Sequence, residues 1–184
     1  MNILALDLAI KTGFALLDAS GKSPVVTSGV QTFELRRGES SGMRSLRLGR
    51  WLEDMRKMVG NEHIDLVAFE KAHHRGGSST EVALAMRAKV IEKAAEWEVD
   101  HTDVHTATLK KFAVKDGRAT KEAMIARACE LFEREPEDDN EADALLILAW
   151  ACEDVGASWK PGVVVGKKVA ECQLRLPFHA AKTK

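Results

Sequence analysis

The feature that most constrains the fold is an apolar run near the C-terminal end of the chain. Residues 144–152, ALLILAWAC, contain no charged side chain, which is typical of a helix buried on nearly all sides. Residues 137–143, EDDNEAD, come directly before it and are mostly acidic. A solvated helix would interleave charged and apolar residues along its whole length, whereas here Asp143 stands where the apolar run begins. An acid in this place requires a partner that stabilises its charge.

The acids of residues 137–143 have two different explanations. Asp138 and Glu141 have the spacing of a capping box, and anions near a helix N-terminus interact favourably with the helix dipole. Asp143 lies a turn too deep to cap the helix. It shares a helical face with Asp139 and Asn140, four and three residues earlier, and like charges at such spacing repel. We therefore expect a metal ion or another cationic partner at Asp143.

Composition places the chain among globular proteins of ordinary size. Its 184 residues are 45% hydrophobic and 30% charged, as expected of one soluble domain with a proper core. The formal net charge is -1, so nucleic-acid binding depends on an uneven distribution of the 27 Lys and Arg residues. That distribution is uneven: basic residues cluster in 36–57, 110–121 and 160–184, and acids in 130–143.

The cysteines and the N-terminus predict a cytoplasmic protein. Cys129, Cys152 and Cys172 form no CxxC pair and no zinc-finger spacing, which indicates reduced thiols. The opening residues, MNILALDLA, lack the basic region of a signal peptide. The longest apolar run is far shorter than the ~20 residues that cross a bilayer.

Alternating apolar runs predict an α/β fold with a mixed five-stranded sheet flanked by helices. Three antiparallel strands are expected first, and strands and helices alternate after them. The predicted strands are 2–8, 12–18, 25–33, 64–69 and 99–104, and the predicted helices are 41–59, 79–97, 106–113, 120–133 and the apolar helix. Thr120 is the expected N-cap of its helix. We expect one domain over residues 1–155, with a basic C-terminal extension of the same domain over 156–184.

Three acids fall at the ends of predicted elements. Asp7 ends the first strand, Glu70 ends the fourth, and Asp143 is near the front of the last helix. In open α/β sheets, functional groups gather where strand ends and helix termini meet, so these acids can come together. Clustered carboxylates are stable only with a proton or a hard cation, and oxygen ligands suit Mg²⁺ or Mn²⁺.

Four segments, in chain order, resemble the motifs of RuvC-type Holliday junction resolvases. ILALDLAIKTGFALLD resembles the first, an Asp followed five residues later by Thr-Gly, and LVAFEK resembles the second, a Glu after an apolar strand. TLKKFAVKDGRATK is similar to the family's basic segment, and NEADALLILAWA to its last motif. The match covers residues 2–152, and the DNEADA wording is most similar to the shorter resolvases of bacteriophages.

The resemblance implies a ribonuclease H-like fold, a homodimer, and a metal-dependent nuclease that cuts branched DNA in the cytoplasm of a bacterial or phage-infected cell. It makes Asp7, Glu70 and Asp143 ligands of two Mg²⁺ ions, for which Mn²⁺ can substitute. The fourth family acid lies three residues before the last, where this chain has Asn140. Asp139, four residues before, lies on the same helical face and is favoured for its charge, while the carbonyl oxygen of Asn140 stays open as the alternative.

The resemblance also assigns basic residues to the DNA. It places Lys121 near the active site, where it holds the scissile phosphate. The expected backbone phosphate contacts are Lys110, Lys111, Lys115 and Arg118. The segment after Glu70 contains His73, His74 and Arg75, whose planar groups can stack on an unpaired base at the junction centre. Solvated basic faces and a glycine loop with incidental histidines are the alternative interpretations.

Two other classes of protein share parts of this pattern. A non-catalytic protein that binds branched DNA and retains the fold is kept open by Asn140. The segment from Asp7 to Gly13 also resembles the phosphate-binding start of sugar kinases and actin-like ATPases. The absence of a glycine directly after Asp7, and a chain too short for two such domains, argue against that class. The sequence therefore favours a Mg²⁺-dependent endonuclease.

Overall fold

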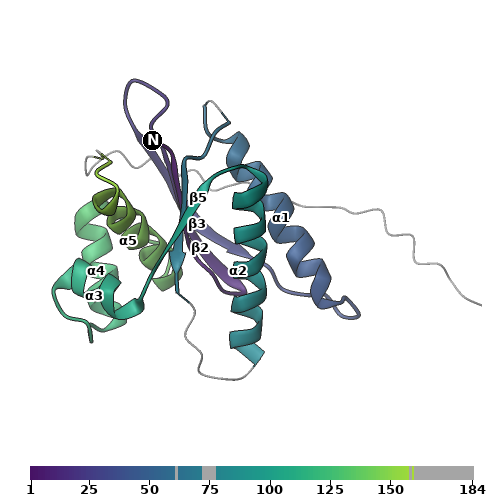
Figure 1. Cartoon of the computed structure of the whole chain (residues 1–184). Helices are drawn as coiled ribbons and strands as arrows, with labels where there is room; N and C mark the ends of the chain where they lie inside the picture. Colours follow the sequence, from purple (N-terminus) through teal and green to yellow (C-terminus); the bar gives the residue numbers. More distant parts are fainter. Residues whose placement is uncertain (61, 72–77, 158, 160–184) are drawn as a thin grey trace, which may run out of the picture.

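The structure is a computed structural model and describes residues 1–60, 62–71, 78–157 and 159. The described chain forms a five-stranded sheet with helices on both faces (Figure 1). The strands are β1 (Ile3–Asp7), β2 (Lys11–Asp18), β3 (Val25–Thr32), β4 (Leu66–Glu70) and β5 (Asp100–Val104). The helices are α1 (Ser41–Lys57), α2 (Ser78–Glu96), α3 (Thr106–Val114), α4 (Lys121–Phe132) and α5 (Asp139–Asp154).

The sheet is mixed, as predicted. Its strand order is β3-β2-β1-β4-β5. The pairs β3–β2 and β2–β1 are antiparallel, and the pairs β1–β4 and β4–β5 are parallel. In the parallel pair, Leu6 of β1 lies opposite Phe69 of β4. The next residues, Asp7 and Glu70, therefore lie at the same edge of the sheet, because parallel strands end together.

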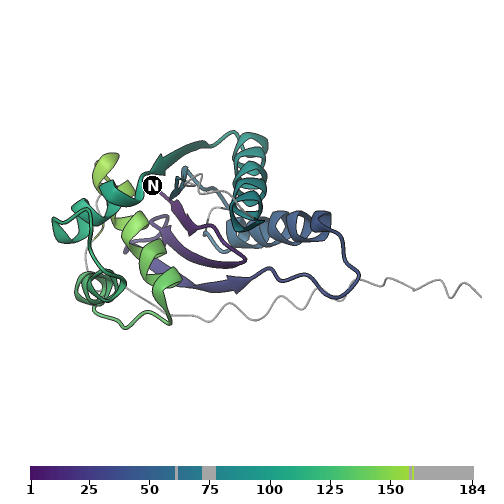
Figure 2. The same ribbon diagram turned by 90° about the horizontal axis from the view of Figure 1, so that it is seen from below.

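Each face of the sheet builds its own hydrophobic core. Helices α1 and α2 cover one face, and α3, α4 and α5 cover the other, as Figures 1 and 2 show from two directions. Strand β1 serves both cores by alternation: Leu4 and Leu6 pack with Trp51 of α1, and Ile3 and Ala5 pack on the side of α5. All four of these β1 residues are fully buried, which explains the continuous apolar run of this strand.

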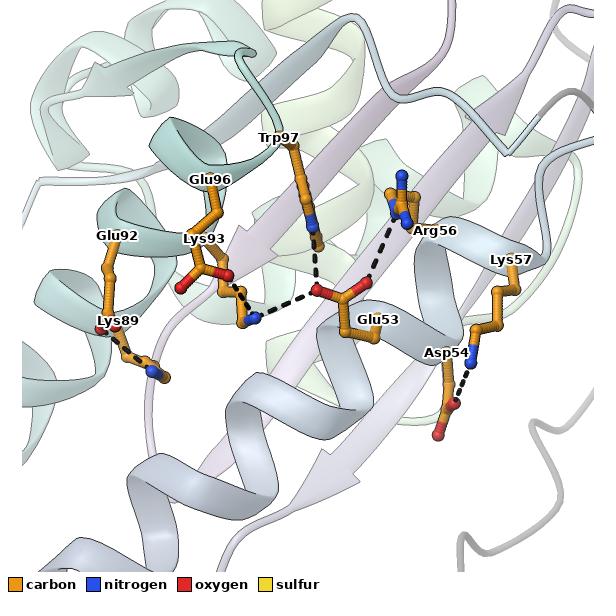
Figure 3. Close-up of polar contacts among 9 residues, drawn as sticks. All are labelled: Glu53, Asp54, Arg56, Lys57, Lys89, Glu92, Lys93, Glu96 and Trp97. Carbon is orange, nitrogen blue, oxygen red and sulfur yellow. Dashed lines mark hydrogen bonds and ion pairs between the residues drawn. The ribbon is translucent and has the colours of Figure 1, made fainter.

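Polar contacts at the solvent edge join α1 to α2. Glu53 of α1 accepts hydrogen bonds from Lys93 Nζ and Trp97 Nε1, each at 3.0 Å, and its other oxygen lies 3.4 Å from Arg56 Nε (Figure 3). Arg47 pairs with Glu39 in the same layer. Part of the basic segment 36–57 therefore has acidic partners within the fold.

Helix α5 is the apolar helix predicted from the sequence, and it lies at the centre of its layer. Of the nine residues of the apolar run 144–152, eight are buried and Trp150 is not. The helix packs on β1 and β2 and is flanked by α3 and α4 (Figure 1). Its N-terminal end reaches the sheet edge at which β1 and β4 end, which places its acids beside Asp7 and Glu70.

Every predicted strand and helix is present, with boundaries shifted by a few residues. Thr120 caps α4 as predicted, because its side chain accepts a hydrogen bond from Ala123 N at 3.3 Å. Within the described residues, no helix is long and apolar enough to span a membrane. Residues 160–184, most of the predicted extension, lie outside the described part of the chain.

Candidate active site

Four acids from three elements meet at one edge of the sheet. Asp7 is the last residue of β1, Glu70 is the last residue of β4, and Asp139 and Asp143 lie in the first two turns of α5. Asp7 and Asp143 are only partly exposed. The convergence that the strand ends predicted is therefore present in the fold.

The acids are close enough to change each other's protonation. Burial raises the pKa of Asp7 well above its usual value of 3.8, and the charges of nearby acids raise it further. These acids are, in order of effect, Asp143, Glu70, Asp139 and Asp138. Burial, then Glu70 and Asp139, raises the pKa of Asp143 to about 6, while Lys110 and Lys121 act in the opposite direction.

Asp7 and Asp143, the two central carboxylates of the cluster, receive little stabilisation of their negative charge from the protein. Within the described residues, neither the Asp7 nor the Asp143 side chain accepts a hydrogen bond. A half-buried carboxylate without donors is costly to ionise, so both groups are poised to take a proton or a cation.

The two outer carboxylates do have donors. Thr106 Oγ1, at the start of α3, donates a hydrogen bond to Glu70 Oε1. Lys121 Nζ, at the start of α4, donates to Asp139 Oδ2, and this hydrogen bond is the main cause that raises the pKa of Lys121. The Lys121 side chain is 75% exposed, so the structure places an exposed cation, paired with Asp139, at the rim of the acidic cluster, where the sequence analysis expected one.

Asp139 and Asn140 differ in what they contact. Asp139 contributes to the raised pKa of both Asp7 and Asp143. Asn140 instead donates from Nδ2 to Asp138 Oδ2 at 3.1 Å. The geometry thus favours Asp139 as the fourth acid of the cluster.

Gly13 explains why α5 can approach so closely. It lies opposite Asp7 in the β1–β2 pair, and a Cβ at Gly13 would stand 1.9 Å from the backbone oxygen of Asn140. Any side chain there would push the start of α5 off the sheet. The Thr-Gly pair of the first motif is therefore a packing requirement of the site: Gly13 admits α5, and buried Thr12 donates to Ala9 O at 2.6 Å.

A buried cluster that the sequence analysis missed holds the start of α5. Asp138 caps the helix as predicted, with Oδ1 accepting from Glu141 N at 3.0 Å, and pairs with Lys11 at 2.5 Å. Glu141, however, is only 1% exposed and accepts from Ser28 Oγ of β3 at 2.8 Å and from Arg134. No spacing in the sequence signals this pairing, because Ser28 is 113 residues away.

The predicted DNA contacts divide into two groups. Lys110 is half-buried, donates from Nζ to Ala119 O at 2.7 Å, and lies close enough to influence Asp143. Lys111, Lys115 and Arg118 are exposed on or just after α3. The predicted base-stacking residues His73, His74 and Arg75 lie outside the described residues.

The four acids are of the right chemical type to bind a hard divalent cation, but in this structure their side chains do not point to one common position. All four acids offer oxygen, which Mg²⁺ and Mn²⁺ prefer. Among the described residues, no three His, Cys, Asp or Glu side chains form a group that could hold one metal ion. Binding a metal ion therefore requires side-chain rotation at Asp7, Glu70, Asp139 or Asp143. The uncompensated charges of Asp7 and Asp143 favour metal binding.

Comparison with solved structures identifies the fold. The Thermus thermophilus RuvC structure matches with a TM-score of 0.67 and 19% sequence identity over 85% of this chain and 98% of that chain. The chain has a RuvC-like fold. T. thermophilus RuvC in complex with a Holliday junction substrate matches equally well, with a TM-score of 0.68 and 19% identity over 85% and 97% of the two chains. No family model and no curated protein sequence matches the chain.

The likeness to Thermus RuvC covers nearly all of that chain, so it extends over sheet and helices alike. The mixed five-stranded sheet flanked by helices, predicted from the order of the elements, is thereby confirmed.

Proposed function

We propose that this chain is a metal-dependent, structure-selective endonuclease that hydrolyses phosphodiester bonds in branched DNA, with four-way junctions among its substrates. The observation that carries the proposal is the meeting of Asp7, Glu70, Asp139 and Asp143 at one sheet edge. Among the described residues, Asp7 and Asp143 have no hydrogen-bond donor. A cluster of this kind destabilises the fold unless it binds cations, which indicates a function for it.

Each residue of the cluster has a proposed role. Asp7, Glu70, Asp139 and Asp143 would hold Mg²⁺, or Mn²⁺ in its place. A pair of such ions supplies Lewis-acid activation of water and stabilises the leaving alkoxide. Lys121 is exposed and pairs with Asp139, so it can turn to a phosphate oxygen when Asp139 binds metal. Lys110 partly neutralises Asp143 from the other side.

The substrate and the assembly are inferred from the RuvC-like fold. The solved complex of T. thermophilus RuvC contains a Holliday junction, and we propose the same class of DNA for this chain. Two symmetric cuts in a four-way junction require two active sites, so we propose a homodimer acting in the cytoplasm of a bacterial or phage-infected cell. The DNEADA segment supports a relation to the shorter phage resolvases.

A cleavage assay tests the proposal. Purified protein is incubated with a labelled four-way junction, a replication fork and a linear duplex, each with Mg²⁺, Mn²⁺ or EDTA. We expect paired nicks in the junction only with metal, and little cutting of the duplex. Asp7→Asn and Glu70→Gln should abolish cleavage while junction binding persists, because removing negative charge beside phosphates reduces repulsion.

Asp54→Asn is the matched control, since Asp54 lies on α1 in the opposite helical layer. This variant should cut at the wild-type rate. Cleavage that survives in folded Asp7→Asn and Glu70→Gln proteins would show that the acids have been assigned the wrong role. Sedimentation that finds only monomer, with and without junction, would contradict the dimer.

A non-catalytic branched-DNA-binding protein is the second candidate. It is favoured by Asn140 in place of an acid and by the absence, among the described residues, of three side chains already grouped around a metal site. Binding to the junction without cleavage in either metal would support this candidate over the endonuclease.

A further inference from the structure

A groove lies between α3 and α5, away from the acidic cluster. Its volume is about 580 Å³, and it is open to solvent on one side. Its lining combines two aromatic rings, two lysines and two acids: Phe112, Trp150, Lys111, Lys115, Glu153 and Asp154. This combination differs from the acidic cluster, whose groups are charged and carry no aromatic ring.

Trp150 is the unusual member of the groove. It belongs to the apolar run 144–152, in which every other residue is buried, and yet the largest side chain of that run reaches the surface. Its ring and that of Phe112 lie over the core that α5 forms with α3 and α4. Within the described residues, nothing accepts a hydrogen bond from Trp150 Nε1, and neither Glu153 nor Asp154 has an ionic partner. The groove therefore presents an aromatic floor with unused polar groups around it.

A nucleotide matches this chemistry better than other ligands do. A base can stack on an indole ring, which is a sequence-tolerant contact. Lys111 and Lys115 are exposed and can bind the flanking phosphates. Glu153 and Asp154 would repel a phosphate, but a carboxylate accepts hydrogen bonds from the exocyclic amine of a base such as cytosine. Thymine offers no such amine, so the acids favour one class of base over another.

The position of the groove connects it to the cluster. Trp150 follows Asp143 by seven residues, which is about two helical turns and ~10 Å along α5, on nearly the same side of the helix. Lys110 of α3 lies close enough to influence Asp143, and its neighbour Lys111 lines the groove. A DNA strand that runs along α5 from the cluster reaches the groove within about three nucleotides.

We propose that this groove binds an unpaired, amine-bearing base of the DNA near the point of cleavage. Trp150 stacks on the base, Glu153 and Asp154 accept from its amine, and Lys111 and Lys115 hold the adjoining phosphates. This inference rests on the proposed function, and it adds a sequence preference to it: cytosine is accepted and thymine is disfavoured at the position that enters the groove.

Photo-crosslinking in EDTA tests the groove without any cleavage. Four-way junctions carry 5-iodocytosine or 5-iodouracil at single positions on either side of the branch point, and the modified residue is mapped by mass spectrometry. We expect attachment at Trp150 that is stronger with iodocytosine. Trp150→Ala should lower attachment by about tenfold or more, and Trp150→Phe, which keeps a ring, should retain part of it. Trp97→Phe, directly after α2 in the other layer, is the matched control and should leave attachment at Trp150 unchanged.

A second variant separates recognition from packing. Glu153 and Asp154 are exposed, so Glu153→Gln with Asp154→Asn should fold normally, bind the junction and lose the preference for iodocytosine. Equal attachment of both bases in the wild type would overturn the proposal that the groove binds a base, and so would attachment of a bound junction at other residues. Neither result would contradict the proposed endonuclease function. A crosslink from Trp150 to another protein segment, in place of the base, would also overturn the proposed base site. Failure to bind the junction at all would overturn both inferences.

Discussion

Asp143 destabilises the folded chain unless its charge is neutralised. Its pKa is raised from 3.8 to about 6, so folding favours the protonated form. The stabilisation that this gives is complete below about pH 4 and is lost as the pH rises through 6. The loss is at most about 3 kcal/mol for a shift of this size, and the raised pKa of Asp7 acts in the same direction.

Replacing Asp143 should therefore stabilise the protein while removing its activity. We expect Asp143→Asn to raise the free energy of unfolding in EDTA by roughly 1–3 kcal/mol at about pH 7.5, and by little at about pH 4, where the wild-type group is already protonated. Urea unfolding at both pH values measures the effect. An equal gain at both would show that the charge of Asp143 is not its cause. Asp54→Asn serves as the control.

Gly13, in contrast to Asp143, stabilises the folded chain, because it allows a close approach of β2 and α5 that no other residue at this position permits. A Cβ at this position would meet the backbone of Asn140 at 1.9 Å, and neither strand nor helix can yield without moving the acids. We expect Gly13→Ala to destabilise the protein by about 1–3 kcal/mol or more and to reduce cleavage further than stability alone explains. Thermal unfolding and the junction assay together measure this.

Gly42→Ala is the matched control for Gly13→Ala. Gly42 lies in α1, and a Cβ there would only approach Ser40 Oγ at 3.7 Å, an ordinary contact. Because alanine favours helix over glycine, this variant should be neutral or stabilising by up to about 1 kcal/mol. If both variants lost the same stability, the close approach of β2 and α5 would not be the reason.

At the scale of elements, the position of α5 depends on a buried ionic cluster. Glu141 of α5, Ser28 of β3 and Arg134 of the α4–α5 connection join three elements, with Arg134 donating to Ser28 Oγ at 2.6 Å and to Glu141. Glu141 also accepts from Glu137 N at 2.5 Å, which holds the chain leading into the helix. These contacts orient the turn that carries Asp139 and Asp143.

Removing Arg134 should loosen that turn. Arg134→Met leaves the carboxylate of Glu141 buried without its cation, which we expect to cost about 3 kcal/mol of stability. Arg127→Met is the control, since Arg127 pairs with Glu130 on the exposed surface of α4 and such pairs contribute less than about 1 kcal/mol. Chemical unfolding of the two variants should differ clearly, and similar losses would refute an anchoring role for Arg134.

The elements themselves could be predicted from the sequence, and the contacts between them could not. Apolar periodicity marks each strand and helix, and strand ends identify Asp7 and Glu70, because these signals are local. Glu141 has the spacing of a capping residue, and only the fold shows that its side chain is buried against Ser28. Trp150 reads as part of a buried helix, since nothing local shows that its neighbour α3 leaves one side open.

At the scale of the whole molecule, near-neutral charge conceals a separation of charge. Lysines of α3 and of the start of α4 surround acids that come from β1, β4 and α5. Under the proposed function, the lysines would attract DNA, while the acids would need cations before a phosphate could approach. Metal and DNA binding are therefore expected to support each other.

Metal binding should be visible as increased stability. We expect millimolar Mg²⁺ to raise the melting temperature at about pH 7.5 and to have a smaller effect at about pH 5, where protons compete for Asp143. Differential scanning fluorimetry measures the shift, with NaCl at equal ionic strength as the control. A shift of the same size in NaCl would mean that general screening, not a bound cation, accounts for it.

The acids that form the cluster are contributed by strands and helices far apart along the chain. Asp7 and Glu70 are made early during synthesis, whereas Asp139 and Asp143 arrive only with α5, the last helix described. A nascent chain, or a proteolytic fragment that lacks α5, therefore holds only two of the four acids. Under the proposed function, the order of the elements delays the assembly of a cleavage centre until α5 has packed on the sheet, so a partly synthesised chain would not cut DNA.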